Sequence, residues 1–99
     1  MVAPGEMLFK DPNAVLVYVF DWTAWLNGAQ IASSSFTISG DDSALTKDAE
    51  QILSGNLKTS LRLSGGTLGE RYTVTNRVVT NEATPQTDDR TVTFLIVQK

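Results

Sequence analysis

The chain contains no cysteine and no histidine. Without cysteine, the fold has no disulfide bond and needs no oxidising compartment to form. Because histidine is also missing, the most frequent general base and the usual zinc ligands are absent. Catalysis by carboxylates alone stays open in principle, but the candidate carboxylates sit in loops with no supporting pattern. We therefore expect neither an enzyme nor a bound metal or cofactor.

Positive charge and long apolar runs are also scarce. The 8 Lys and Arg residues are outnumbered by 11 Asp and Glu, which gives a formal net charge of −3. A chain with no basic stripe is poorly suited to bind nucleic acid. No apolar run approaches the ~20 residues that a membrane helix needs, and residues 1–10 lack the pattern of a signal peptide. We expect no membrane association, and a product that stays in the cytoplasm or is assembled into a particle inside the cell.

Length and composition indicate one small folded domain. With 99 residues, the chain is long enough for one hydrophobic core and too short for two. Hydrophobic residues make up 41% of the chain and include two Trp, two Tyr and four Phe. This apolar content is too high for a disordered segment.

Short apolar segments with period-two alternation follow one another along the chain, and turn residues separate them. The strand candidates are residues 7–10, 14–20, 30–39, 57–63, 72–80 and 91–97. Residues 44–53 fit a short helix and a bridging strand equally well. About seven strands with a turn every 8–12 residues or so are typical of an antiparallel sandwich. The segment 21–28 predicts a turn or a single helical turn that ends at Asn27-Gly28.

The alternation also predicts which side chains form the core. The core candidates are Tyr18, Trp25, Phe36, Ile38, Leu61, Leu63, Tyr72, Val74, Phe94 and Ile96. The segment 14–20 differs from the others because it is apolar on both faces. We expect this strand to be covered on both sides, in part by a neighbouring chain.

Tyr72 carries the most specific indication of the fold. It follows the turn residue Gly69 and precedes the inward residue Val74 by two positions. This spacing resembles the tyrosine corner of Greek-key sandwiches, in which the hydroxyl bonds the backbone a few residues upstream. An ordinary strand tyrosine is the alternative. The predicted fold class is all-β, an immunoglobulin-like Greek-key sandwich of about seven antiparallel strands.

Two tryptophans three residues apart allow two interpretations. Trp22 and Trp25 could form a pair that stacks on a sugar or a partner, or one could fill the sandwich centre while the other covers its end. We favour the core for Trp25 and leave Trp22 open between the two.

Two other motifs favour structural interpretations. The acidic pairs at 41–42 and 88–89 lack the spaced pattern of a calcium loop, so solvated loop carboxylates are expected. The Gly-rich residues 64–69 lack the Gly-Lys-Ser/Thr end of a phosphate loop and read as a turn.

Two longer blocks carry a resemblance to a known family. The blocks are Asp21-Trp22-x-x-Trp25-Leu26 and Ser64-Gly65-Gly66-Thr67-x-Gly69-x-x-Tyr72-x-Val74-Thr75-Asn76-Arg77. Together with the segments around them, over residues 10 to 99, they resemble small tailed-phage virion proteins of the fibre–tail adaptor or head–tail neck type. The resemblance implies an immunoglobulin-like adaptor, present in several copies, that bridges the tail or neck to fibres. It brings no catalytic residues. Residues 40–58 and 83–87 depart from the family pattern, so the docking partner is open.

We therefore expect a structural adaptor in the virion, made in the host cytoplasm, with other tail, neck and fibre subunits as partners. Residues 10–99 would form the sandwich, and residues 1–9 an arm or edge strand that orders on a neighbour. Phe20, Trp22 and Arg77 are the candidate partner contacts. The alternative is an immunoglobulin-like capsid decoration or carbohydrate- or surface-binding module that uses Trp22 and the 40–43 loop.

Overall fold

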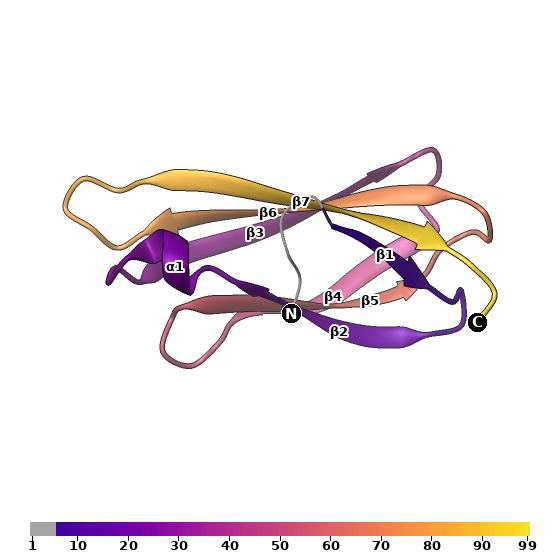
Figure 1. Cartoon of the computed structure of the whole chain (residues 1–99), viewed down its shortest axis with the longest axis horizontal. Coiled ribbons are helices and arrows are strands. Elements are labelled where there is room, and N and C mark those ends of the chain that lie inside the picture. The colour runs from indigo at the N-terminus through magenta and orange to yellow at the C-terminus, as the bar shows by residue number, and fades with distance from the viewer. Residues whose placement is uncertain (1–5) are drawn as a thin grey trace.

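The computed structural model describes residues 6–99, which form two β-sheets packed face to face (Figure 1). The described residues contain seven strands and one short helix. The elements are β1 (Met7–Lys10), β2 (Val15–Asp21), α1 (Thr23–Leu26), β3 (Ile31–Gly40), β4 (Leu45–Ile52), β5 (Lys58–Gly65), β6 (Arg71–Thr80) and β7 (Thr87–Ile96). The Cα atoms extend over 45 × 22 × 19 Å. The module is therefore about twice as long as it is wide.

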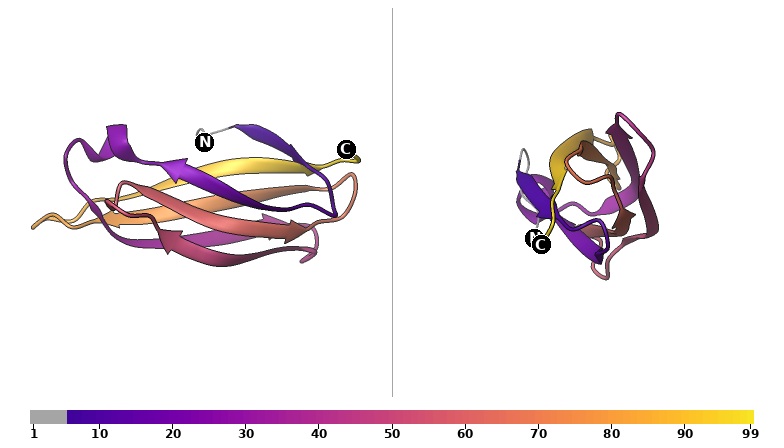
Figure 2. Two further views of the ribbon diagram at one scale, coloured as in Figure 1. Left: turned by 90° about the horizontal axis from the view of Figure 1, so that it is seen from below. Right: turned by 90° about the vertical axis from the view of Figure 1, so that its right-hand side faces the viewer.

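The strand order is β1-β7-β6-β3 in one sheet and β2-β5-β4 in the other. All neighbouring strands are antiparallel except β1 and β7, which run parallel. The end-on view in Figure 2 shows the two layers. The predicted all-β sandwich of seven strands is confirmed, and its assignment as an immunoglobulin-like Greek key stays a prediction. Of the predicted arm, residues 1–5 lie outside the described residues, and residues 7–10 form β1.

The structure decides one segment that the sequence leaves open and extends a second strand beyond its predicted start. The ambiguous residues 44–53 form the strand β4, paired with β5. The strand candidates 72–80 and 91–97 leave residues 81–90 outside any strand, but β7 already begins at Thr87. Pairing with β6 explains the early start: Arg77 lies opposite Asp89, and the two side chains form an ion pair at 2.8 Å. Polar residues can extend a strand when their side chains stay exposed and find partners across the ladder.

The helical turn predicted near residues 21–28 is confirmed as α1. The Asp21 carboxylate accepts hydrogen bonds from the Thr23 backbone N–H and from its hydroxyl, which starts the turn. The turn ends at Asn27 and Gly28, with φ angles of 46° and 96°. Asparagine and glycine are the residues that adopt this left-handed conformation most readily.

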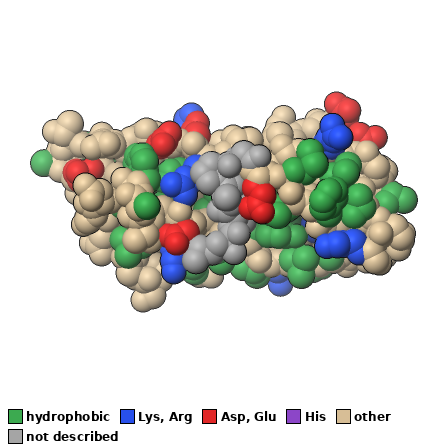
Figure 3. Space-filling model, viewed as in Figure 1, with side chains coloured by type: hydrophobic (Ala, Val, Ile, Leu, Met, Phe, Trp, Pro, Cys, Tyr) green, Lys and Arg blue, Asp and Glu red, His purple; other side chains and the backbone are tan. Residues whose placement is uncertain are grey.

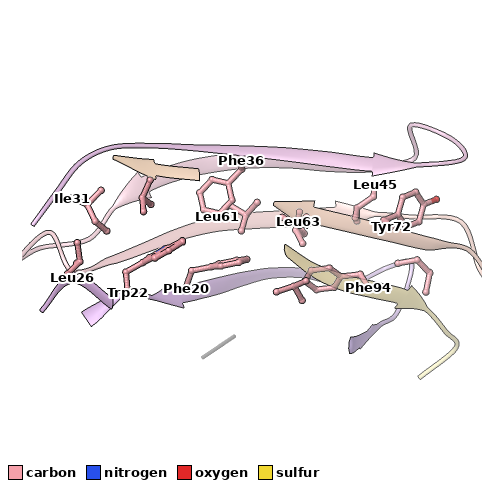
Figure 4. Close-up of a cluster of buried hydrophobic side chains, with 14 residues drawn as sticks. Phe20, Trp22, Leu26, Ile31, Phe36, Leu45, Leu61, Leu63, Tyr72 and Phe94 are labelled. Carbon is pink, nitrogen blue, oxygen red and sulfur yellow. The ribbon is translucent and has the colours of Figure 1, made fainter. Parts of the chain in front are cut away.

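The core lies between the sheets and consists of side chains from six of the strands and from the segment around α1 (Figure 4). Most of the predicted core residues are buried: Phe36, Leu61, Leu63, Tyr72, Val74, Phe94 and Ile96. Tyr18, Trp25 and Ile38 are half-buried and pack against this cluster. Edge-to-face ring contacts at 4.9 and 5.6 Å join Tyr18 to Phe94 and Phe20 to Phe36, and so connect the two sheets.

The Tyr72 hydroxyl makes the backbone bond expected of a tyrosine corner. It accepts a hydrogen bond from the Thr67 N–H at 2.9 Å and donates one to the Asp42 carboxylate at 2.6 Å. Asp42 also accepts bonds from the Thr67 hydroxyl and the Ala44 N–H. These four residues join the β3–β4 loop to the β5–β6 turn.

A second polar group lies at the centre of the core. The Asn76 amide on β6 is buried and makes four hydrogen bonds. Its oxygen accepts from Trp22 Nε1 at 2.9 Å and from the Thr59 hydroxyl at 2.6 Å. Its nitrogen donates to the Ser34 hydroxyl and the Ser35 carbonyl, both at 2.9 Å. Thr59 belongs to β5 and Trp22 follows β2, so both lie on the side of the three-stranded sheet. Ser34 belongs to β3 of the four-stranded sheet, as Asn76 belongs to β6. This amide therefore links the two sheets.

We predict that Asn76→Ala lowers the free energy of unfolding by about 3 kcal/mol, because it leaves the Trp22 N–H and the Thr59 hydroxyl buried without a partner. Chemical denaturation of the full chain measures the change. The matched control is Asn13→Ala, at an exposed position, which should stay within about 0.5 kcal/mol of the parent. Equal effects of the two substitutions would contradict the central role of this amide.

A pH dependence follows from Asp42. Its hydrogen bond from Tyr72, followed by those from Ala44 and Thr67, lowers the pKa of this carboxyl below its usual value. A carboxyl whose pKa is lower in the folded state stabilises the fold above the ordinary aspartate pKa of about 3.9, and this stabilisation is lost as the pH falls through the folded-state pKa. We predict that Asp42→Asn lowers the melting temperature at pH 6, and that its difference from the parent shrinks towards pH 3.

Thermal unfolding followed by circular dichroism between pH 6 and pH 3 measures this difference. The neighbouring substitution Asp41→Asn removes a charge from the same loop and leaves the Asp42 hydrogen bonds in place, so it serves as the control at pH 6. A gap between Asp42→Asn and the parent that stays constant down to pH 3 would show that the Asp42 charge does not contribute in this way.

Candidate docking surface

Large apolar side chains are exposed on β1 and β2, at the corner where the chain passes from one sheet to the other. Met7 and Phe9 of β1 and Val15, Leu16 and Val17 of β2 have between 43% and 61% of their surface exposed. We call these five residues the apolar seam. Figure 3 shows exposed hydrophobic side chains gathered on the right of the molecule, over the part where Figure 1 places β1 and the start of β2.

The position of β1 and β2 at sheet edges explains this exposure. Val17 lies opposite Arg62 in the ladder with β5, on the outer face of the three-stranded sheet. Leu16 lies opposite the buried Leu63 and so faces inward, yet it is 46% exposed. It stays exposed because β2 is an edge strand, beyond which the described part of the chain places no further strand. Residues 6–99 thus do not supply the expected cover on both sides of residues 14–20.

Lys10 holds β1 against the opposite sheet. Its side chain is buried, and its ammonium donates hydrogen bonds to the Gly65 carbonyl at 2.7 Å and to the Asp11 carbonyl at 3.0 Å. Desolvation lowers the pKa of Lys10, while the negative charge of Asp11 acts in the opposite direction. A buried ammonium needs such acceptors because loss of hydration is costly. The bond to Gly65 ties the end of β1 to the end of β5.

Asp11 holds the turn between the two strands of the apolar seam. Its carboxylate accepts hydrogen bonds from the backbone N–H groups of Lys99 and Asn13, which lower the pKa of Asp11. The Asp11 carbonyl accepts a further bond from the Ala14 N–H at 3.0 Å. The corner is therefore organised before any partner binds, and a partner would lose little entropy in ordering it.

The structure corrects two of the three predicted partner contacts. Phe20 and Trp22 are 1% and 0% exposed, so neither side chain can touch a partner while the domain is folded. Trp22 is held by the bond to Asn76 and by the guanidinium of Arg90, which lies 4.1 Å from the centre of its ring system. Arg77 is exposed and stays a predicted contact, although Asp89 already pairs with it.

The sequence indicates only part of the apolar seam. The two-sided apolarity of residues 14–20 predicts that a neighbouring chain covers this strand in part, but it names none of the five seam residues as a partner contact. Which edge of the sandwich this strand occupies depends on pairing with β5, whose paired residues lie 37 (Asp21 to Lys58) to 49 (Val15 to Ser64) positions further along the chain. No local pattern shows such pairing.

A small pocket of about 250 Å³ lies at the other end of the sandwich, between α1 and the β6–β7 loop. Its lining residues are Trp25, Leu26, Asn27, Thr80, Glu82 and Gln86. Within residues 6–99, no group of three or more Asp and Glu side chains is placed to hold a metal ion. The described part of the chain also has no helix with the length and apolarity to cross a bilayer.

These features define a class of protein: an all-β module whose exposed apolar residues gather along two sheet edges. The comparison with known families is consistent with a module of this kind. Residues 10–95 match the family described as podophage GP4 fiber-tail adaptor protein gp77, and the chain belongs to this family. The match covers the sandwich from the last residue of β1 to β7, and it confirms the predicted resemblance to fibre–tail adaptors. No protein among the curated sequences matches the chain.

Proposed function

We propose that this chain is a structural subunit of a phage virion that links the tail or neck to fibres by docking other subunits. It catalyses no reaction, is made in the host cytoplasm and is retained in several copies in the assembled tail. Residues 10–99 are the docking module, and residues 1–9 are an arm that includes the edge strand β1. The family match supports the adaptor role. The observation that carries the docking mechanism is the exposed apolar seam.

Clusters of exposed apolar residues mark interaction sites more often than isolated exposed apolar residues do. Polar groups border the apolar seam, as they border the apolar centre of most protein interfaces. In the four-stranded sheet, Phe9 of β1, Leu95 of β7 and Arg71 of β6 lie side by side on neighbouring strands. This row of two apolar residues therefore ends in the exposed, positively charged Arg71. Lys99 lies on the other side and donates to the Phe9 carbonyl. A partner surface with an apolar centre and acidic residues at its rim would complement this arrangement.

An adaptor needs two separate contacts, and the shape of the module provides two ends. The β1–β2 turn and the β5–β6 turn lie at one end, while α1 and the β6–β7 loop lie at the other (Figure 1). The long dimension of 45 Å separates these ends. We assign the apolar seam to one partner and the end with α1 to a second.

We predict that Val15→Asp depletes the chain from assembled virions, because a carboxylate in the apolar seam would be desolvated at the interface. The measurement is the number of copies per virion, by quantitative mass spectrometry of purified phage. At least a tenfold depletion is expected, which corresponds to about 1.4 kcal/mol of lost binding. The matched control is Thr37→Asp, which places the same charge on an exposed position of β3 and should leave the copy number unchanged.

Both variants should melt within a few degrees of the parent, since both substitutions are on exposed strand positions. Normal incorporation of Val15→Asp would remove the apolar seam from the docking mechanism. Absence of the parent chain from purified virions would contradict the proposed function as a whole.

A second candidate function is a carbohydrate-binding or capsid-decorating module. The observation that favours it is the pocket near α1, where the half-buried Trp25 lies beside the polar residues Asn27, Glu82 and Gln86. An aromatic face with amide and carboxylate groups around it suits a neutral sugar. We assign the candidate sugar site to this pocket because Trp22 is buried and Asp42 of the 40–43 loop is engaged by Tyr72.

If this second function holds, neutral mono- and disaccharides should change the tryptophan fluorescence of the chain in a saturable way, because Trp25 lines the pocket. Glu82→Gln and Trp25→Leu should abolish the response, whereas Glu50→Gln, on the exposed β4, should not. A linear, unsaturable response in the parent would exclude the carbohydrate function and leave the adaptor function untouched.

A further inference from the structure

The sandwich has four edge strands: β1 and β3 border one sheet, and β2 and β4 border the other. An edge strand presents unpaired backbone N–H and C=O groups that can pair with a strand of another chain. Proteins usually block such edges with charges, bulges or short strands. The four edges of this module differ in how far they are blocked.

The β4 edge is blocked by its backbone and by its charges. A register shift interrupts its ladder with β5 between Asp48 and Gln51. Within this bulge Ala49 has a φ of 51°, a left-handed conformation that turns the strand away from regular pairing. Lys47 and Glu50 form an ion pair at 2.7 Å beside the bulge. An incoming strand would have to disrupt both features.

The β1 and β3 edges offer little to an incoming strand. β1 is four residues long, and the Lys99 ammonium donates to the Phe9 carbonyl at 3.4 Å. β3 is longer, but its exposed positions in the middle of the strand are Ser33, Ser35 and Thr37. Pairing there would bury hardly any apolar surface.

The β2 edge is regular and apolar. Its ladder with β5 runs without a shift from Val15 to Asp21. The Trp22 N–H donates to the Leu57 carbonyl at 3.0 Å. This bond shows which residues of β2 direct their backbone groups towards β5 and which direct them away from it. In antiparallel pairs, every second residue bonds the neighbouring strand and the residues between them point their N–H and C=O groups outward. The backbone groups of Val15, Val17 and Val19 therefore point to the free edge.

The same three valines lie on the outer face of the sheet, while the alternate residues of β2 face the core side. Val15, Val17 and Val19 lie opposite Ser64, Arg62 and Ser60 of β5. Leu16, opposite the buried Leu63, remains half-exposed on the core side. A strand added to β2 would thus bury apolar surface on both of its faces.

We propose that the β2 edge binds an extended, proline-free segment of a tail or fibre subunit, which is apolar on both faces and extends the three-stranded sheet by one strand. This inference rests on the proposed adaptor function and specifies how one of its contacts is made. The incoming backbone pairs with Val15, Val17 and Val19, and its side chains cover Leu16 on one face and the valines on the other.

A second copy of this chain is a less suitable occupant. A stable interface buries roughly 800 Å² on each partner, and the five half-exposed side chains of the apolar seam supply well below this area. A segment tethered within a virion needs less area, since its effective concentration near β2 is high. The flanking groups at the corner, Arg71 and Lys99, favour an acidic residue next to the apolar segment.

Two substitutions at Val17 separate backbone pairing from side-chain contact. Val17→Pro keeps an apolar side chain but removes the outward N–H, and it leaves the bonds to β5 in place. Val17→Thr keeps this N–H and the β-branched shape but is more polar. We expect at least tenfold fewer copies of Val17→Pro per purified virion, and a copy number close to the parent for Val17→Thr. Equal incorporation of Val17→Pro and the parent would overturn strand addition.

Hydrogen exchange provides a second measurement that needs no variant. In the free chain the amides of Val15, Val17 and Val19 should exchange quickly, while those of Leu16 and Tyr18 are protected by β5. In intact virions the three valine amides should become protected at least tenfold. Unchanged exchange in virions that contain the chain would overturn the inference but not the adaptor function. If the protection of these amides in the free chain rises with the concentration of the chain, a second copy occupies the β2 edge. That result would overturn the inference.

Discussion

The fold depends on the buried amide of Asn76. Its four hydrogen bonds reach a tryptophan, two side-chain hydroxyls and a backbone carbonyl, and they join the two sheets at a place where the chain has no cysteine to form a covalent link. Because every polar atom of the amide is satisfied, its burial carries little penalty, whereas any shift of one sheet against the other would break several bonds at once. The network thus fixes how the sheets face each other, and the aromatic contacts around it fill the remaining space.

Because the Asn76 hydrogen bonds hold the centre of the sandwich together, the edge strands β1 and β2 can stay uncovered. A small sandwich must bury most of its apolar residues to be stable, yet this one leaves Met7, Phe9 and the first residues of β2 exposed. The corner that carries them is held by polar contacts: Lys10 binds the Gly65 carbonyl, and Asp11 binds the Lys99 backbone. Stability comes from the centre of the sandwich and from these ties, so the apolar seam can be reserved for other subunits.

The sequence predicted the interior well and the exterior poorly, for a physical reason. Alternation is a local signal, so it correctly indicated the inward residues of β5, β6 and β7, and the spacing around Tyr72 correctly indicated the bond to the backbone of Thr67. The sequence predicts Phe20 and Trp22 as contacts, but large aromatics suit cores as well as interfaces, and both are buried. Which strand lies at an edge depends on pairing between distant segments. For this reason, the exposure of Val15, Leu16 and Val17 became evident only in the three-dimensional structure.

The parallel pair of β1 and β7 has a consequence for the order of events during synthesis. Met7 lies beside Thr93, so β1 can pair with its neighbour only after the residues of β7 have left the ribosome. Contacts between such distant segments form late and slowly. The corner that presents β1 and β2 together is therefore completed last. A nascent chain that still lacks β7 therefore does not yet display the finished surface.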